Sequence, residues 1–450
     1  MRVGNGGNPF GGGNDQIIQL LNYRPLMRRI YRICSESTRV RTIAAILLLG
    51  AWIRLYLHFS GLHDGVIPGF KKPDLNIVLL ETVGYHDEVT AALYFAVGNI
   101  RRTNITMFLT RPRFGIEEVY SWMQLTHELS PVSIQDASQF GAIDRAMPDL
   151  IISVTSEFDT VGQHNTLQYY LEHGPKHLTL LCVSHHPDRF SLFEESVRPW
   201  AQAGRLRYLA LSTHTALNLR EEFNKFQYYG DVPIDVLPPI FPVPLETSST
   251  GNISISLQGN FDPDRRDYRK TFEDLDHFVL QLPEPLTSRF QLTLLGSGNS
   301  MPDVPERVRP YISIKSHLDY IPYYQQLHES FALIPAFADD DYYTTKASST
   351  IPAAFIGNVP ILSSQRLSDA YTYMSHESMW LTKGEESEIS TVRDILSAHF
   401  DEFGKELGSW EVAVERKRRM VQSRASEMME GNVKFFKTLC QTLSKQSATK

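Results

Sequence analysis

Short apolar runs alternate with amphipathic stretches over residues 75–211. Each run is too short for a buried helix, and each following stretch has apolar residues three or four positions apart, as one face of a helix requires. The predicted strands are 75–80, 105–109, 150–154, 178–183 and 206–211, and the predicted helices are 86–98, 116–129, 165–172 and 191–203. Continuous apolar strands joined by helices are typical of a parallel sheet covered on both faces. We therefore expect an α/β, Rossmann-like domain over residues 73–236.

The alternation stops at residues 237–251 and then resumes. Prolines at positions 238, 239, 242 and 244 precede a patch rich in Ser, Thr and Gly, a composition typical of a linker. The next predicted strands are 253–257, 291–295, 311–314, 332–335 and 359–362, and the next helices are 268–280, 320–327 and 346–356. This pattern predicts a second Rossmann-like domain over residues 252–395 and a helical tail over 396–450.

One stretch of the second domain, residues 330–364, places polar residues between two predicted strands. We predict a helix that begins at Lys346 and has Ser348, Ser349 and Thr350 in its first turn. The first turn of a helix has unpaired backbone N–H groups, which together with the hydroxyls suit a phosphate. Lys346 adds a positive charge, so this stretch is the candidate diphosphate site.

With Gly357 and Pro360 closing the short helix, residues 330–364 resemble the donor-binding segment of GT-B fold glycosyltransferases. The resemblance implies two Rossmann-like domains separated by a cleft, with a nucleotide-sugar donor held by the second domain. It further implies an acceptor bound by the first domain: a glycan, a protein or a lipid. The implied donor-binding residues are Gly259, Arg265, Arg266, Lys346, Ser348, Ser349 and Thr350.

The sequence departs from the pattern of this family at one point. Many retaining members carry two glutamates whose places in this chain are occupied by Thr345 and Ala353. This chain therefore lacks that acidic pair. Its absence leaves alternatives to a hexosyltransferase-like enzyme open. One is a catalytically inactive binding or scaffold protein with the same fold, and another is an epimerase acting on nucleotide sugars.

The loop after the first predicted strand holds a candidate catalytic base. Ligands of open parallel sheets bind beyond the carboxyl ends of the strands, and His86 lies in such a loop, followed by Asp87 and Glu88. Several inverting GT-B enzymes use a histidine base in this loop, held by a carboxylate. The resemblance therefore implies His86 as base and Asp87 or Glu88 as its partner. The alternative is an ordinary helix start, where both acids complement the positive end of the helix dipole.

A second loop, residues 184–188, has two adjacent histidines, His185 and His186. Neighbouring side chains diverge in an extended chain, so the pair is a poor metal site. It either contacts substrate or shapes the turn at Pro187.

The net charge of −7 gives no electrostatic reason to expect a nucleic-acid partner. Short acidic patterns occur at Asp262, Asp264 and residues 339–341, but GT-B transfer does not require a bound metal ion. We therefore expect no metal and no cofactor, because the nucleotide sugar is itself a substrate.

The N-terminal part of the chain has the composition of a membrane anchor. Residues 1–41 contain a glycine-rich stretch and six arginines from Arg24 onwards, and residues 42–62 are mostly apolar. A helix of that length is about 31 Å long, enough to span a bilayer. Arg54 near its end would reach the interface by snorkelling. The alternative is a buried helix of a soluble protein.

The charges around this stretch predict the orientation of the chain. Arginines precede it and Lys71 is the first basic residue after it, which predicts a single-pass type II protein with a cytosolic N-terminus. The catalytic part would then lie in the lumen of the Golgi or endoplasmic reticulum. Asn104 and Asn252 begin N-x-S/T sequons and are candidate glycosylation sites in that location.

Overall fold

The computed structural model describes residues 75–142, 147–246, 252–298, 301–383, 387–408 and 410–448. Residues 73–450 form one compact unit, and the account below concerns this unit. The predicted anchor at 42–62 lies outside the described residues. None of the helices in the described ranges is long and apolar enough to cross a membrane.

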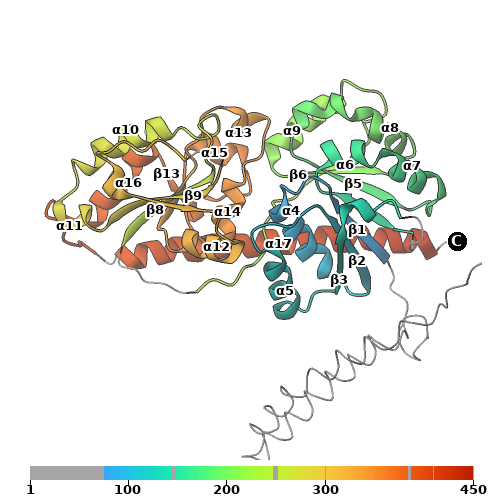
Figure 1. Ribbon diagram of the computed structural model, residues 1–450, viewed down its shortest axis with the longest axis horizontal. Helices are drawn as coiled ribbons and strands as arrows, with labels where there is room; N and C mark the ends of the chain where they lie inside the picture. Colours follow the sequence, from blue (N-terminus) through green and yellow to red (C-terminus); the bar gives the residue numbers. More distant parts are fainter. Residues whose placement is uncertain are drawn as a thin grey trace, which may run out of the picture. The chain divides into compact units, whose positions relative to one another are not determined.

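The first half of this unit is a parallel sheet whose strand order is β3-β2-β1-β4-β5-β6-β7 (Figure 1). Its strands are β1 (Leu75–Glu81), β2 (Thr103–Leu109), β3 (Val132–Asp136), β4 (Leu150–Ser153), β5 (Thr179–Ser184), β6 (Leu206–Ala210) and β7 (Ile234–Val236). The α-helices are α4 (Asp87–Gly98), α5 (Ile116–Thr126), α6 (Ser156–Gly162), α7 (His164–His173), α8 (Glu194–Gln202) and α9 (Thr213–Phe223). Two short 3₁₀ helices, η1 (Ala137–Gln139) and η2 (Pro187–Leu192), complete this half.

The second half is a separate parallel sheet with the strand order β10-β9-β8-β11-β12-β13. Its strands are β8 (Ile253–Asn260), β9 (Phe290–Ser297), β10 (Ile312–Ser316), β11 (Ala332–Ile334), β12 (Ile361–Ser363) and β13 (Met379–Leu381). The helices are α10 (Tyr268–Val279), α11 (Glu284–Thr287), α12 (Tyr320–His328), α13 (Asp341–Thr344), α14 (Thr350–Ile356), α15 (Gln365–Ala370), α16 (Glu388–His399) and α17 (Trp410–Ala448), with η3 (Arg309–Tyr311) and η4 (His376–Ser378). The sequence prediction of two Rossmann-like sheets is therefore confirmed.

Apolar burial explains why the central strands form where they do. Every residue of β4 and β5 is buried, as expected of strands covered on both faces. By contrast, β3 lies at the sheet edge and is mostly exposed, with the polar sequence VSIQD. The hydrophobic pattern did not predict this strand, because little of it is buried.

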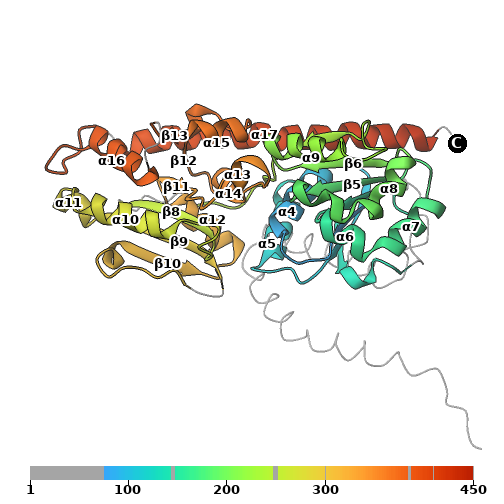
Figure 2. The same cartoon turned by 90° about the horizontal axis from the view of Figure 1, so that it is seen from above.

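The long helix α17 joins the two halves. Figure 2 shows it running along the same side of both sheets, and its contacts include α4 of the first half and α14 of the second. One buried apolar cluster contains Val97 of α4, Ile356 of α14 and Phe436 of α17. The helical tail expected from the sequence thus completes the core of both halves.

Residues 237–246 are packed rather than loosely connecting. Ile240 and Phe241 are buried within the same apolar cluster, and the Pro238 carbonyl accepts a hydrogen bond of 2.8 Å from the buried Asn432 amide on α17. The proline-rich segment therefore connects the two halves, but it is packed against the core. Prolines suit such a segment because they lack the N–H group that would otherwise need a partner.

Both predicted glycosylation sites have exposed side chains. Asn104 lies near the start of β2, where its side-chain amide nitrogen donates to the Asn76 side-chain oxygen at 3.1 Å. Asn252 directly precedes β8. Modification of these two residues stays a prediction.

Candidate functional site

The two sheets place their topological switch points around one cavity. The strand order reverses between β1 and β4 in the first sheet and between β8 and β11 in the second. Such reversals open a crevice beyond the carboxyl ends of the strands, where ligands of open α/β sheets bind. The loops after β1, β5, β8 and β11 line a cavity of about 750 Å³. This volume lies within the range of small-molecule sites.

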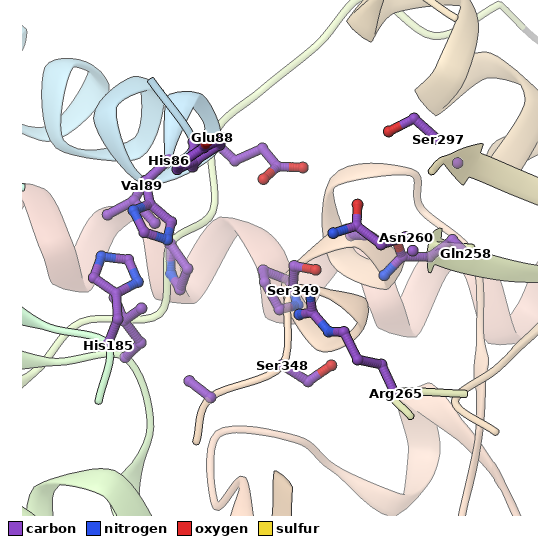
Figure 3. Close-up of a pocket in the computed structure, with 18 of the residues that line it drawn as sticks. His86, Glu88, Val89, His185, Gln258, Asn260, Arg265, Ser297, Ser348 and Ser349 are labelled. Carbon is purple, nitrogen blue, oxygen red and sulfur yellow. The ribbon is translucent and has the colours of Figure 1, made fainter. Parts of the chain in front are cut away.

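The first wall of the cavity carries His86, which directly precedes α4 (Figure 3). Its Nδ1 lies 2.8 Å from the Thr155 hydroxyl, and that hydroxyl donates to the Glu81 carboxylate at 3.4 Å. Because the Thr155 proton is directed to Glu81, Thr155 accepts from His86 Nδ1–H. The His86 Nε2 then keeps its lone pair and is available as a proton acceptor.

The carboxylate behind His86 is therefore Glu81, which acts through Thr155, and not Asp87 or Glu88 as the resemblance implied. Asp87 is buried, and its Oδ2 lies 3.8 Å from Arg113 Nε. Successive residues of a helix point about 100° apart, so His86 and Asp87 cannot share one direction. Burial raises the pKa of Asp87 to about 7, an effect that the nearby Arg113 charge opposes. The predicted catalytic role of Asp87 has no support in this geometry.

Two buried acids fix the loops that hold His86. Glu81 accepts hydrogen bonds from the backbone N–H groups of Val83 and Gly84, and Asp159 accepts from Thr82 and Thr155. Asp159 thereby ties the loop after β1 to the loop after β4. Burial raises the pKa of Asp159 to about 7, while these hydrogen bonds lower it. Neither acid was singled out from the sequence, and both lie beside the switch point between β1 and β4.

His86 stacks on His185, with ring centroids 3.7 Å apart, and both rings line the cavity. Burial, followed by the His185 charge, lowers the pKa of His86 well below its ordinary value. A depressed pKa keeps the imidazole neutral at physiological pH, as a base requires. The His185–His186 turn is fixed by Glu157, which accepts from both backbone N–H groups at 2.6 and 2.7 Å.

The opposite wall is built around a buried arginine. Arg266 is 2% exposed, and it donates to the Gln258 carbonyl at 3.0 Å and to the Thr350 hydroxyl at 2.8 Å. The Gln258 side chain also donates to Thr350 and accepts from the Tyr323 hydroxyl. Arg266 and Thr350 were predicted to contact a donor directly. Both residues join the loop after β8 to α14. Thr350 is fully buried and does not line the cavity, whereas Arg266 does line it, so its contact with a donor stays a prediction.

Gly259 packs against the same guanidinium. Its φ of +135° is rarely adopted by other residues, and a Cβ atom there would lie 2.8 Å from Arg266 Nη2. The close approach that the glycine permits is thus with Arg266.

Two cations of this wall are accessible to a ligand. Arg265 is exposed, its Nε donates to the Tyr342 hydroxyl at 2.9 Å, and its guanidinium extends into the cavity (Figure 3). Lys346 also lines the cavity, and its ammonium group is paired with Asp341. This hydrogen bond raises the pKa of Lys346 and keeps it charged.

The short helix begins at Thr350 instead of Lys346, and Ser349 is its N-cap. The Ser348 N–H donates to the Tyr371 hydroxyl at 2.8 Å, and the Thr350 N–H donates to the Ser348 hydroxyl at 3.2 Å. The expectation of unpaired N–H groups at these two residues was therefore wrong, because side chains satisfy them. Ser348 and Ser349 both line the cavity, and Ser349 is the exposed one.

His214 of α9 connects the first half to the segment of the second half that contains Lys346. Its Nε2 lies 3.0 Å from the Lys346 carbonyl, and its Nδ1 lies 3.0 Å from the Ala370 carbonyl. The position of Lys346 is therefore coupled to the packing of the two halves.

No protein-family model and no curated relative matches this sequence. Among solved structures, that of Anabaena Alr3699/HepE in complex with UDP-glucose is 13% identical and has a TM-score of 0.50. The match covers 84% of this chain and 100% of that one. The fold is GT-B-like.

An alpha-glucosyltransferase in complex with UDP-glucose and DNA containing an abasic site also matches, at 12% identity over 78% of this chain and 95% of that one. Its TM-score of 0.49 is lower, so the fold assignment rests on the Anabaena structure.

Gly259→Ala tests the packing around Arg266 in the cavity wall that the second half contributes. The new methyl group meets the Arg266 guanidinium and the backbone leaves its preferred φ, so we expect a loss of about 1–3 kcal/mol in the free energy of unfolding. Thermal denaturation measures this change.

Gly431→Ala is the matched control, because a Cβ atom at this position of α17 meets nothing within 4 Å. Alanine in a helix should stabilise by about 0.5–1 kcal/mol. Equal effects of the two substitutions would contradict the proposed packing role of Gly259.

Proposed function

We propose that the protein transfers a sugar from a nucleoside-diphosphate sugar to a hydroxyl group of an acceptor. The observation that carries this proposal is one cavity with chemically different walls. The second half contributes Arg265 and Lys346, and the first half contributes His86 and Glu88. A nucleoside-diphosphate sugar has an anionic centre and a neutral, hydroxyl-rich end, which matches this division.

The diphosphate would lie against the second half. Arg265 offers a guanidinium that can donate two hydrogen bonds to phosphate oxygens, and Lys346 offers a charged ammonium group. The exposed Ser349 hydroxyl would add a polar contact. Binding would replace the Lys346–Asp341 pair by a pair with phosphate, and both cations would then stabilise the negative charge that develops on the departing diphosphate.

His86 would act on the acceptor. The acceptor hydroxyl oxygen forms a bond to the anomeric carbon while the bond from that carbon to the diphosphate oxygen breaks. His86 Nε2 takes the hydroxyl proton, and the nucleoside diphosphate leaves with the electron pair of the broken bond. Glu81 and Thr155 hold the ring in the required tautomer.

UDP is the first ligand to test, since the Anabaena protein of the same fold was crystallised with UDP-glucose. We expect the protein to bind UDP, and Lys346→Ala to weaken the affinity roughly tenfold or more, because a charged hydrogen bond to phosphate is lost. Isothermal titration calorimetry measures both affinities.

Lys315→Ala is the control for this substitution, as Lys315 is exposed on β10 and does not line the cavity. It should bind UDP like the wild type. If UDP and other nucleoside diphosphates all fail to bind the wild type, a scaffold protein that binds no nucleotide explains the fold better. Conversion of a nucleotide sugar into its epimer without an acceptor would identify an epimerase.

His86→Ala separates chemistry from donor binding. A general base contributes about 10²–10⁴-fold to the rate, so kcat should fall by that factor while the affinity for UDP stays close to that of the wild type. Product formation from UDP-glucose with a panel of hydroxyl acceptors gives kcat. Unchanged turnover would remove His86 from the mechanism.

The membrane location belongs to the proposal as well. The apolar stretch 42–62 with arginines before it supports a single-pass type II anchor and a lumenal catalytic part. In intact microsomes that contain the full chain, we expect protease to spare residues 73–450 until detergent is added. Digestion of this part without detergent would reverse the proposed orientation.

A further inference from the structure

Glu88 stands apart from the rest of the helix that carries it. Every other residue of α4 is buried, whereas Glu88 is partly accessible and lines the cavity. Figure 3 shows its carboxylate reaching from α4 into the cavity, on the side opposite Arg265 and Asn260. The side chain thus extends away from the helix that packs into the core and enters the space available to a ligand.

Arg113 lies near Glu88 and also lines the cavity, but it is not paired with Glu88. Within the described ranges, no lysine, arginine or histidine forms an ion pair with it, whereas the adjacent Asp87 is paired with Arg113. Three tyrosines of α12, in the second half of the protein, lie near Glu88. Burial raises the pKa values of Tyr320, Tyr323 and Tyr324, and the Glu88 charge raises them further. The Tyr324 hydroxyl hydrogen-bonds to Glu88.

A carboxylate in this position restricts what can bind beside it. An anionic phosphate would be repelled, which places the diphosphate near Arg265 and Lys346 on the other wall. Neutral hydroxyl groups, by contrast, donate to a carboxylate, and charge-assisted hydrogen bonds of this kind are stronger than those between neutral groups. Two carboxylate oxygens can accept from two neighbouring hydroxyls of one sugar ring.

We propose that Glu88 binds the sugar of the donor by accepting hydrogen bonds from its ring hydroxyls, and so selects sugar nucleotides over the bare nucleotide. This inference rests on the function proposed above and assigns the orientation of the donor in the cavity. Arg265 and Lys346 hold the diphosphate, and Glu88 holds the sugar from the opposite wall.

The protonation of Glu88 gives this recognition a pH dependence. Burial, and then the Asp87 charge, raise the pKa of Glu88 to about 7, while Arg113 and Tyr324 lower it. The neighbouring His86, which precedes α4, stays neutral, and Tyr320 and Tyr323 of α12 carry no charge in this range. Since the ionised carboxylate is the better acceptor, the preference for the sugar nucleotide should weaken as the pH falls through about 7.

Glu88→Gln in the full chain tests the proposal. We expect its affinity for UDP to match that of the wild type or to be slightly tighter, because a negative charge is removed from the cavity. Its affinity for UDP-glucose should fall roughly tenfold or more, so that the preference for UDP-glucose over UDP is lost. Calorimetric titration with each of the two ligands, at pH 6 and pH 8, gives the four affinities of each variant.

Glu118→Gln is the matched control, since Glu118 is an exposed glutamate of α5 that does not line the cavity. It should keep both the preference for UDP-glucose and its pH dependence. Glu88→Gln should lose both. A Glu88→Gln protein that prefers UDP-glucose as the wild type does would overturn the proposal, and so would loss of turnover with the preference intact.

Stability provides a second measurement that does not depend on catalysis. A carboxyl group whose pKa is raised on folding binds its proton more tightly in the folded state, so its contribution to stability falls as the pH rises from the unfolded value towards about 7. Glu88→Gln removes this loss and should melt higher than the wild type at pH 8. A lower melting temperature at that pH would make Glu88 a structural residue. Failure of the wild type to bind either ligand would reject the proposed function itself.

Discussion

The cavity depends on one buried guanidinium. Arg266 is enclosed on all sides and would be unfavourable without partners, since burying an unpaired charge is costly. Its partners include the Gln258 carbonyl at the end of β8 and the Thr350 hydroxyl at the first residue of α14. Satisfying this charge therefore fixes the distance between the end of β8 and the start of α14. Arg265 and Lys346, which line the cavity, lie on the two segments that this frame joins.

In the first half, buried acidic side chains fix the loops at the cavity, as Arg266 does in the second. Glu81 and Asp159 are buried and accept hydrogen bonds from backbone N–H groups of the loops beside them. They hold His86 through Thr155 at the cavity wall. In both halves, the deeply buried charged groups join the segments whose side chains line the cavity, and these networks lie at the switch point of each sheet.

Much of this arrangement could be predicted from the sequence, and the remainder depends on side-chain direction. Buried strands such as β4 and β5 have uninterrupted apolar sequences, so the two sheets could be inferred. The edge strand β3 could not, because its residues are mostly exposed and polar. His86 was placed at the site because it follows β1. The pattern could not show that Thr155, distant in sequence, is its partner, nor that Arg266 is buried while Arg265 extends into the cavity.

Helix α17 also determines when, during synthesis, the core around α4 can be completed. Helix α4 is almost entirely buried, and one of the elements that cover it is α17, which spans residues Trp410–Ala448. A ribosome synthesises α4 long before α17, so the apolar surface of α4 that α17 covers stays uncovered until α17 has been made. Domains generally fold as units while they are being made. Here the sheet of the first half can form before α17 is made, but this face of α4 is covered only when α17 packs against it.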